Sequence, residues 1–185
     1  MPLIKQGLLT ADPFQAVADG VDLPPEGPIL IGLARWQEER GLIEPRNTLV
    51  GVRLKPADAV EQLLADLDRL ALVALEFPKF NDGRAFSQAR LLRQRHGYTG
   101  EIRATGRVLR DQLLFMHRSG FDSYEVGGDI TPEILAAAIG IFSVVYQPAA
   151  DCRPAAMTLR QQVAANELLQ GGKSAHPRIE CQCAR

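Results

Sequence analysis

Two carboxylates in the middle of the chain lie close to cations, as proton transfer or anion binding would require. Asp82 and Asp111 each lie within two residues of an arginine. A carboxylate beside such cations can act as a general acid or base, and arginine and lysine bind oxyanions such as sulfite, sulfate or phosphate. Asp82 and Asp111 are therefore the candidate catalytic residues. The candidate anion-binding residues are Lys79, Arg84, Arg103 and Arg110.

The same residues also have a purely structural interpretation. Asp82 lies between an asparagine and a glycine directly before an expected helix, which is typical of a turn that caps a helix N-terminus. Arg84 and Arg103 can pair with carboxylates of the chain, such as Glu76, instead of with a ligand. The residue types alone leave both interpretations open.

The charge of the chain is unevenly distributed. The net charge is -1, but residues 79–118 hold nine Lys or Arg against three Asp or Glu, a net of +6 that leaves -7 for the rest. The basic segment suits an anion or an acidic partner, although the solvated faces of two helices have the same composition. A nucleic-acid partner is not expected, because the chain is slightly acidic and has no recognisable nucleic-acid-binding motif.

The elements that must position these residues alternate between strand and helix. This alternation, with no strands joined by a two-residue hairpin turn, predicts an α/β fold with a parallel sheet. An open doubly wound sheet is the first interpretation and a partial β/α barrel is the alternative. The expected domain spans 28–148, preceded by an N-terminal arm at 1–27 and followed at 149–185 by a helix and a disordered tail. The expected strands are 29–33, 48–54, 70–77, 101–105, 123–126 and 144–146, and the main expected helices are 56–67, 84–96, 108–119, 131–142 and 157–169.

The parallel arrangement places the candidate residues at one edge of the sheet. Ligands of such folds bind beyond the carboxyl ends of the strands, where loops meet helix N-termini. Lys79 and Arg84 follow the strand expected at 70–77, and Arg103 belongs to the strand expected at 101–105. We therefore expect these cations to converge on one cationic rim.

Several classes of protein are not expected from the motifs. There is no P-loop and no glycine-rich dinucleotide fingerprint after any expected strand, so no cofactor is predicted. The chain has three cysteines, at 152, 181 and 183, which are too few for a four-thiolate site. His176, Cys181 and Cys183 could bind a soft metal, but this is the less favoured interpretation, so no metal is predicted. The absence of a long apolar stretch and of a signal peptide predicts a cytoplasmic protein without a membrane span.

The segment from Leu75 to Arg93 carries a motif that continues through 97–104, 108–113 and 120–125. Over about residues 28–148 the chain resembles a bacterial family with a domain of unknown function. Members are commonly labelled as oxidoreductases of sulfite reduction, and their genes often accompany assimilatory sulfite reductase. The resemblance directs attention to the same charged residues as above. It adds the motif residues Phe77, Pro78, Phe80, Gly83 and Gln112.

The resemblance and the charge pattern together give three functional hypotheses. The first is an accessory protein of assimilatory sulfite reduction that binds an oxyanion or a redox partner, such as sulfite reductase, through the cationic rim. The alternatives are an enzyme of the same pathway, with Asp82 or Asp111 transferring protons, and an assembly factor for the reductase. A pocket containing Lys79, Arg84 and Arg103 would favour oxyanion binding or catalysis, whereas a flat basic surface would favour protein docking.

Overall fold

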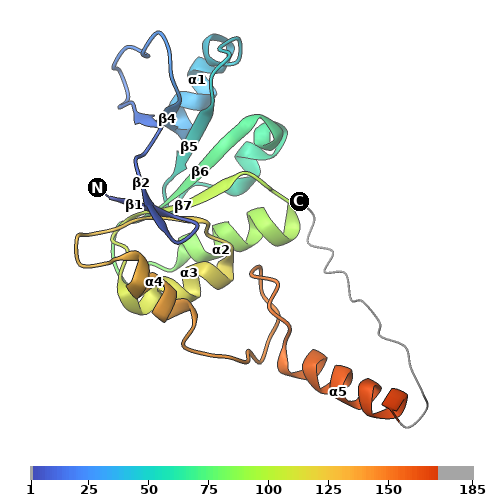
Figure 1. The fold of residues 1–185 in the computed structure, drawn as a ribbon. Coiled ribbons are helices and arrows are strands. Elements are labelled where there is room, and N and C mark those ends of the chain that lie inside the picture. Colours follow the sequence, from blue (N-terminus) through green and yellow to red (C-terminus); the bar gives the residue numbers. More distant parts are fainter. Residues whose placement is uncertain (1, 171–185) are drawn as a thin grey trace.

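A curled sheet forms the centre of the computed structural model, which describes residues 2–170 (Figure 1). Within the described residues this sheet has eight strands, in the order β2-β1-β8-β7-β6-β5-β4-β3. The strands are β1 (Leu3–Lys5), β2 (Leu8–Thr10), β3 (Gln15–Ala16), β4 (Ile29–Gly32), β5 (Val50–Leu54), β6 (Leu70–Phe77), β7 (Glu101–Gly106) and β8 (Ser123–Glu125). As predicted, β6 is buried and has neighbours on both sides.

The strands β3 to β8 are parallel and lie in chain order, so each strand pairs with the next one. A doubly wound sheet requires a reversal of strand order, and this sheet has none between β3 and β8. The sheet curls into a half-barrel, which is the alternative of the two predicted folds, and the expectation of a doubly wound sheet is wrong. Strand–helix alternation does not distinguish the two folds, because both use the same repeating unit.

The expectation of a purely parallel sheet is also wrong. β1 runs antiparallel to both β2 and β8, so the sheet is mixed. Gln6 and Gly7 join β1 to β2 with φ angles of 52° and 76°, as in a two-residue hairpin turn with both residues in the left-handed region. The sequence pattern missed this hairpin because its strands are three residues long and its turn lacks the usual Asn-Gly or Asp-Gly pair.

Helices of several kinds connect the strands. α1 begins directly after β4, η1 is a 3₁₀ helix before β6, and α2 passes into a short π-helical segment, η2. α4 begins as predicted, with Pro132 in its first turn and the Thr131 hydroxyl accepting a bond from the Ile134 amide. The bounds are α1 (Leu33–Ile43), η1 (Val60–Arg69), α2 (Arg84–Arg90), η2 (Leu91–Arg95), η3 (Arg110–Gln112), α3 (Leu113–Ser119), α4 (Pro132–Ile139) and α5 (Ala156–Gln170).

The two faces of the sheet are covered differently. Side chains such as Val73 and Leu75 pack with the helices in the main hydrophobic core, which holds most of the buried apolar residues. On the other, concave face, Phe14 of the N-terminal segment packs on Leu30, Leu72 and Ala74 of the sheet. The N-terminal segment therefore contributes strands to both edges of the sheet and covers part of its concave face.

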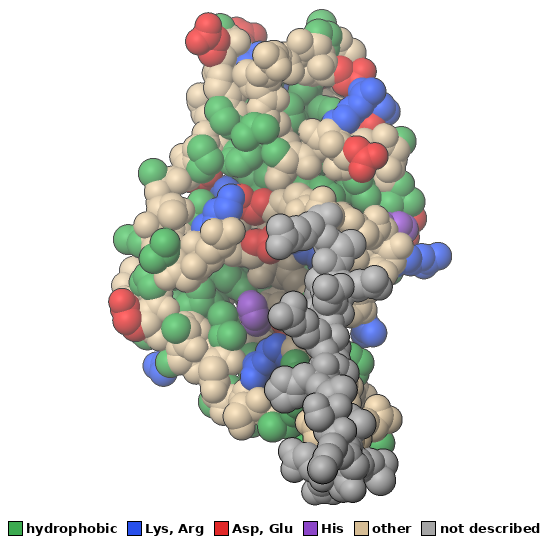
Figure 2. Space-filling model, turned by 45° about the vertical axis from the view of Figure 1, so that its right-hand side comes forward, with side chains coloured by type: hydrophobic (Ala, Val, Ile, Leu, Met, Phe, Trp, Pro, Cys, Tyr) green, Lys and Arg blue, Asp and Glu red, His purple; other side chains and the backbone are tan. Residues whose placement is uncertain are grey.

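The chain after α4 leaves the sheet. The strand expected at 144–146 is not formed, and Val145 makes only an isolated bridge to Ala155. α5 then extends away from the rest of the molecule (Figure 1). No helix among residues 2–170 is long and apolar enough to cross a membrane. The tail expected to be disordered and the metal ligands considered at 176, 181 and 183 lie outside the described residues, and such residues are drawn in grey in Figure 2.

Candidate functional site

The loops that follow β6 and β7 lie side by side at the C-terminal edge of the sheet. The Arg107 amide donates a 2.7 Å hydrogen bond to the Phe77 carbonyl, and the Gln112 side-chain amide donates one of 2.8 Å to the Phe80 carbonyl. These bonds bring together a group of exposed cationic residues that we call the basic rim. The basic rim consists of Lys79, Arg84, Arg107 and Arg110.

Asp82, the first candidate catalytic residue, is engaged by Arg84. The guanidinium donates two bonds, of 2.9 Å from Nε and 2.7 Å from Nη2, to the two carboxylate oxygens. The Arg84 amide donates a further bond of 3.3 Å at the start of α2. These bonds from Arg84, helped by the charge of Lys79, lower the pKa of Asp82 from its ordinary value. Asp82 is thus held as a carboxylate that fixes the loop, and it is a poor proton acceptor.

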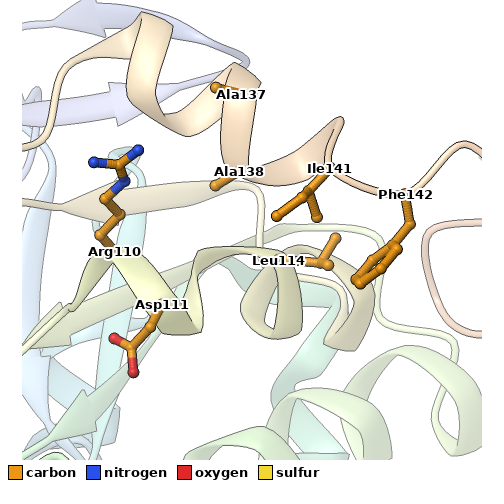
Figure 3. A pocket seen from close by; sticks show the side chains of 7 residues that line it. All are labelled: Arg110, Asp111, Leu114, Ala137, Ala138, Ile141 and Phe142. Carbon is orange, nitrogen blue, oxygen red and sulfur yellow. The ribbon is translucent and has the colours of Figure 1, made fainter.

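Asp111, the second candidate, lies in η3 beside a pocket of about 530 Å³ (Figure 3). Arg110 lies at one end of this pocket and Phe142 at the other, while the Asp111 carboxylate points away from the apolar side chains. The Asp111 carboxylate has no hydrogen-bond or ion-pair partner among the described residues. The pocket is lined by Arg110, Asp111, Leu114, Ala137, Ala138, Ile141 and Phe142.

Arg103 does not join the basic rim, contrary to the expected convergence. Its side chain is fully buried on the concave face, in the middle of β7. Nε and Nη2 donate bonds of 3.0 and 2.9 Å to Glu101, and Nη1 donates one of 2.7 Å to Asp12. Carboxylates of the chain therefore occupy the guanidinium, as the structural interpretation of the sequence predicted, but they are Glu101 and Asp12 and not Glu76.

Further bonds to Glu101 complete this buried charge cluster. Lys5 Nζ donates at 2.6 Å and the Ser123 hydroxyl donates at 2.6 Å. Burial alone would raise the pKa of Glu101, but these two bonds and the charge of Arg103 outweigh it and lower the pKa. The cluster connects β1, β7, β8 and the N-terminal segment, so its role in this structure is to hold the concave face together.

The motif residues divide between core and surface. Phe77 is buried, and its ring contacts Phe86 and Phe121 at centroid distances of 5.0 and 5.8 Å. Pro78 is exposed, and 63% of Phe80 is exposed in the loop that carries Lys79. Gly83 immediately precedes α2. The motif thus builds the β6–α2 loop and anchors it to the core through Phe77.

Arg107 belongs to the basic rim, although it is not one of the four candidate anion-binding residues. It follows Gly106, which has a left-handed φ of 85°. A Cβ on Gly106 would lie 2.6 Å from the Phe77 carbonyl oxygen. The sequence offers one signal for this arrangement. Gly106 directly follows the strand expected at 101–105, and a glycine at such a position indicates a turn from which the next side chain, Arg107, projects.

The fold and these loops define an α/β half-barrel protein with a basic, solvent-exposed surface at the C-terminal edge of its sheet. Residues 51–157, more than half of the chain, match the model of a family described as a bacterial protein of unknown function, DUF934. The protein belongs to this family. No curated protein matches the chain.

Proposed function

We propose that the protein is a cytoplasmic accessory protein of assimilatory sulfite reduction that docks a redox protein, such as sulfite reductase, through the basic rim. The pathway comes from the resemblance of its central motifs to proteins labelled as oxidoreductases of sulfite reduction. The docking role is supported by one observation in particular. The hydrogen bonds from Arg107 and Gln112 join two loops into one surface on which the cations are exposed.

The geometry favours docking over an oxyanion pocket at this position. Lys79 in the β6–α2 loop and Arg84 at the start of α2 are exposed, whereas Arg103 is buried on the other face and bound to carboxylates. Arg84 is itself engaged by Asp82. An exposed basic surface binds an acidic protein surface and accelerates its association through long-range attraction.

The apolar pocket next to Arg110 supplies the second component of a docking surface. Ile141 and Phe142 on its wall are 67% and 57% exposed in the free protein. Protein interfaces combine such apolar anchors with arginine, and a few of these residues contribute most of the binding energy. The partner surface that fits carries acidic side chains facing the basic rim and an apolar side chain facing the pocket.

Calorimetric titration of purified sulfite reductase with the full chain tests this proposal. The variant Arg107→Glu/Arg110→Glu changes two cations whose side chains have no bond to other described residues. We expect it to weaken binding by about tenfold or more, and higher salt to weaken binding of the unaltered protein.

The matched control is Arg90→Glu/Arg95→Glu, because these exposed arginines lie on α2 and η2, outside the basic rim. The control should bind like the unaltered protein. Absence of a complex, or an equal loss of affinity in both double variants, would exclude docking through the basic rim.

A further inference from the structure

A second group of polar residues lies on the concave face, near the C-terminal ends of the parallel strands. Val52, Leu75 and Ala104 point into the helix-side core. Because side chains alternate along a strand, their sequence neighbours point to the opposite, concave face. These neighbours are Arg53 on β5, Glu76 on β6 and Thr105 on β7. Tyr124 on β8 also points into the main core, so its neighbour Glu125 points to the concave face as well.

The strand register places these residues close together. Arg53 pairs with Ala74, which pairs with Arg103, and Glu76 pairs with Thr105 one step nearer to the C-terminal edge. The N-terminal segment covers the deeper part of this face, where Phe14 packs on Leu72 and Ala74. Arg53, Glu76 and Glu125 remain only partly buried.

The two arginines of this face differ in their partners. Arg103 is bound by Glu101 and Asp12, as described above. The side chain of Arg53 has no ion pair or hydrogen bond within residues 2–170, and its Nε is buried without an acceptor. A buried guanidinium donor that lacks an acceptor costs free energy, which a bound anionic group would recover. The Glu76 carboxylate likewise has no hydrogen-bond or ion-pair partner among the described residues.

The carboxylates beside Arg53 restrict what its ligand can be. Glu125 Oε1 lies 3.8 Å from Arg103 Nη1, and 19% of its side chain is exposed. Burial raises the pKa of this carboxyl and the charges of Arg103 and Arg53 lower it. The effect of burial is the larger one, so the pKa lies above its ordinary value. A simple inorganic anion would meet repulsion from Glu76 and Glu125. A ligand that also carries hydrogen-bond donors would not.

We propose that this face binds a small organic acid, with its carboxylate on Arg53 and an adjacent ammonium or hydroxyl group donating to Glu76 and Glu125. The position agrees with the general location of ligands at the C-terminal ends of barrel strands. The site is separate from the basic rim, which lies on the loops that lead to the helices. It therefore goes beyond the proposed docking function and does not depend on it.

Three acids with the same three-carbon skeleton distinguish the components of this ligand. L-Alanine carries the ammonium group, L-lactate the hydroxyl group, and propionate neither of them. The side-chain Nε–H resonance of Arg53 in the isotope-labelled full chain reports binding of each acid, with sulfate as the fourth probe. We expect saturable shifts with L-alanine or L-lactate, and binding weaker by about tenfold or more for propionate and sulfate.

Two variants connect the shifts to the proposed contacts. Arg53→Met should abolish binding, followed through backbone amide resonances of β5 and β6, while the exposed-site control Arg95→Met should retain it. Glu125→Gln should reduce the preference for L-alanine over propionate while the protein stays folded. The proposal is overturned by the absence of saturable shifts with all three acids, by equal affinity for propionate, or by unchanged binding in Arg53→Met.

Discussion

The guanidinium of Arg103 lies over the ring of Phe14, with 5.5 Å between Arg103 Cζ and the ring centroid. This contact joins a residue in the middle of β7 to a segment that precedes the whole parallel sheet. The same guanidinium binds Asp12, two residues before Phe14. One buried arginine thus binds the N-terminal segment at two neighbouring residues, in addition to the contacts of Lys5 and Phe14 described above.

We predict that Arg103→Met lowers the free energy of unfolding by about 3 kcal/mol or more, because Glu101 then loses a partner in a site where only 6% of its side chain is exposed. Urea denaturation followed by circular dichroism measures the loss. Lys79→Met, on the exposed loop, is the control and should change stability by less than about 0.5 kcal/mol. Equal effects of the two substitutions would refute the structural role of Arg103.

Arg93 has a comparable role on the helix side. Its side chain donates hydrogen bonds to the carbonyls of Tyr98, Gly100 and Gly120 and pairs with Asp122. We predict that Arg93→Ala costs about 2–4 kcal/mol, because several partly buried acceptors lose their donor. The neighbouring Arg95 is exposed, so Arg95→Ala should be nearly neutral in the same denaturation experiment. Similar stabilities of the two variants would contradict this interpretation.

The strand pattern shows which parts of the fold the sequence could predict. β6 and β7 were recognisable because their apolar residues are nearly continuous or alternate clearly. Charged residues within the strands also indicate a curled sheet. Arg53, Glu76, Arg103 and Glu125 are charged positions within expected strands, whereas a sheet covered by helices on both faces has mainly apolar strands. These charged strand positions therefore favour a sheet with one face free of helices.

The candidate site was less predictable than the fold. As the sequence predicted, Lys79 and Asp82 lie in the loop after β6, which ends at Phe77, and Arg84 begins the following helix, α2. The sequence did not predict that Arg103 lies apart from them, since this depends on which face of β7 the side chain occupies and on the distant Asp12. Contacts between residues far apart in the chain leave no local pattern.

The turn after β7 can be tested through Gly106. Alanine at this position would require a left-handed φ of 85° and place its Cβ 2.6 Å from the Phe77 carbonyl oxygen. We predict a loss of about 2–4 kcal/mol in unfolding free energy for Gly106→Ala, from backbone strain and the clash together. Gly97 is also left-handed, with φ of 63°, but has no atom within 4 Å of the added Cβ. Gly97→Ala should therefore cost only about 1–2 kcal/mol, and an equal cost at both positions would exclude the clash.

Stability should fall in mildly acidic solution because of His117. Burial is the main cause that lowers the pKa of its imidazole from the ordinary value of 6.5. The unfolded chain then binds a proton more readily than the folded one, so stability is full above pH 6.5 and falls as the pH decreases through the folded-state pKa. His117→Gln should flatten the dependence of the unfolding free energy on pH in this window. An unchanged slope in the variant would show that other groups cause it.

The apolar part of the proposed docking surface can be tested through Ile141. Ile141 on the pocket wall is 67% exposed, so Ile141→Ser removes little buried surface from the free protein and should leave its stability almost unchanged. If a partner side chain fills the pocket, the same substitution removes an apolar contact in the complex and should weaken binding of sulfite reductase by about tenfold.

Leu42 on α1 is 73% exposed and provides the control, because it resembles Ile141 in size and exposure and does not line the pocket. Leu42→Ser should bind the reductase with unchanged affinity in the same calorimetric titration. Since neither substitution alters charge, the comparison separates apolar anchoring from the attraction exerted by the basic rim. If Ile141→Ser binds as tightly as Leu42→Ser, the partner does not occupy the pocket, and docking would rest on the cations alone.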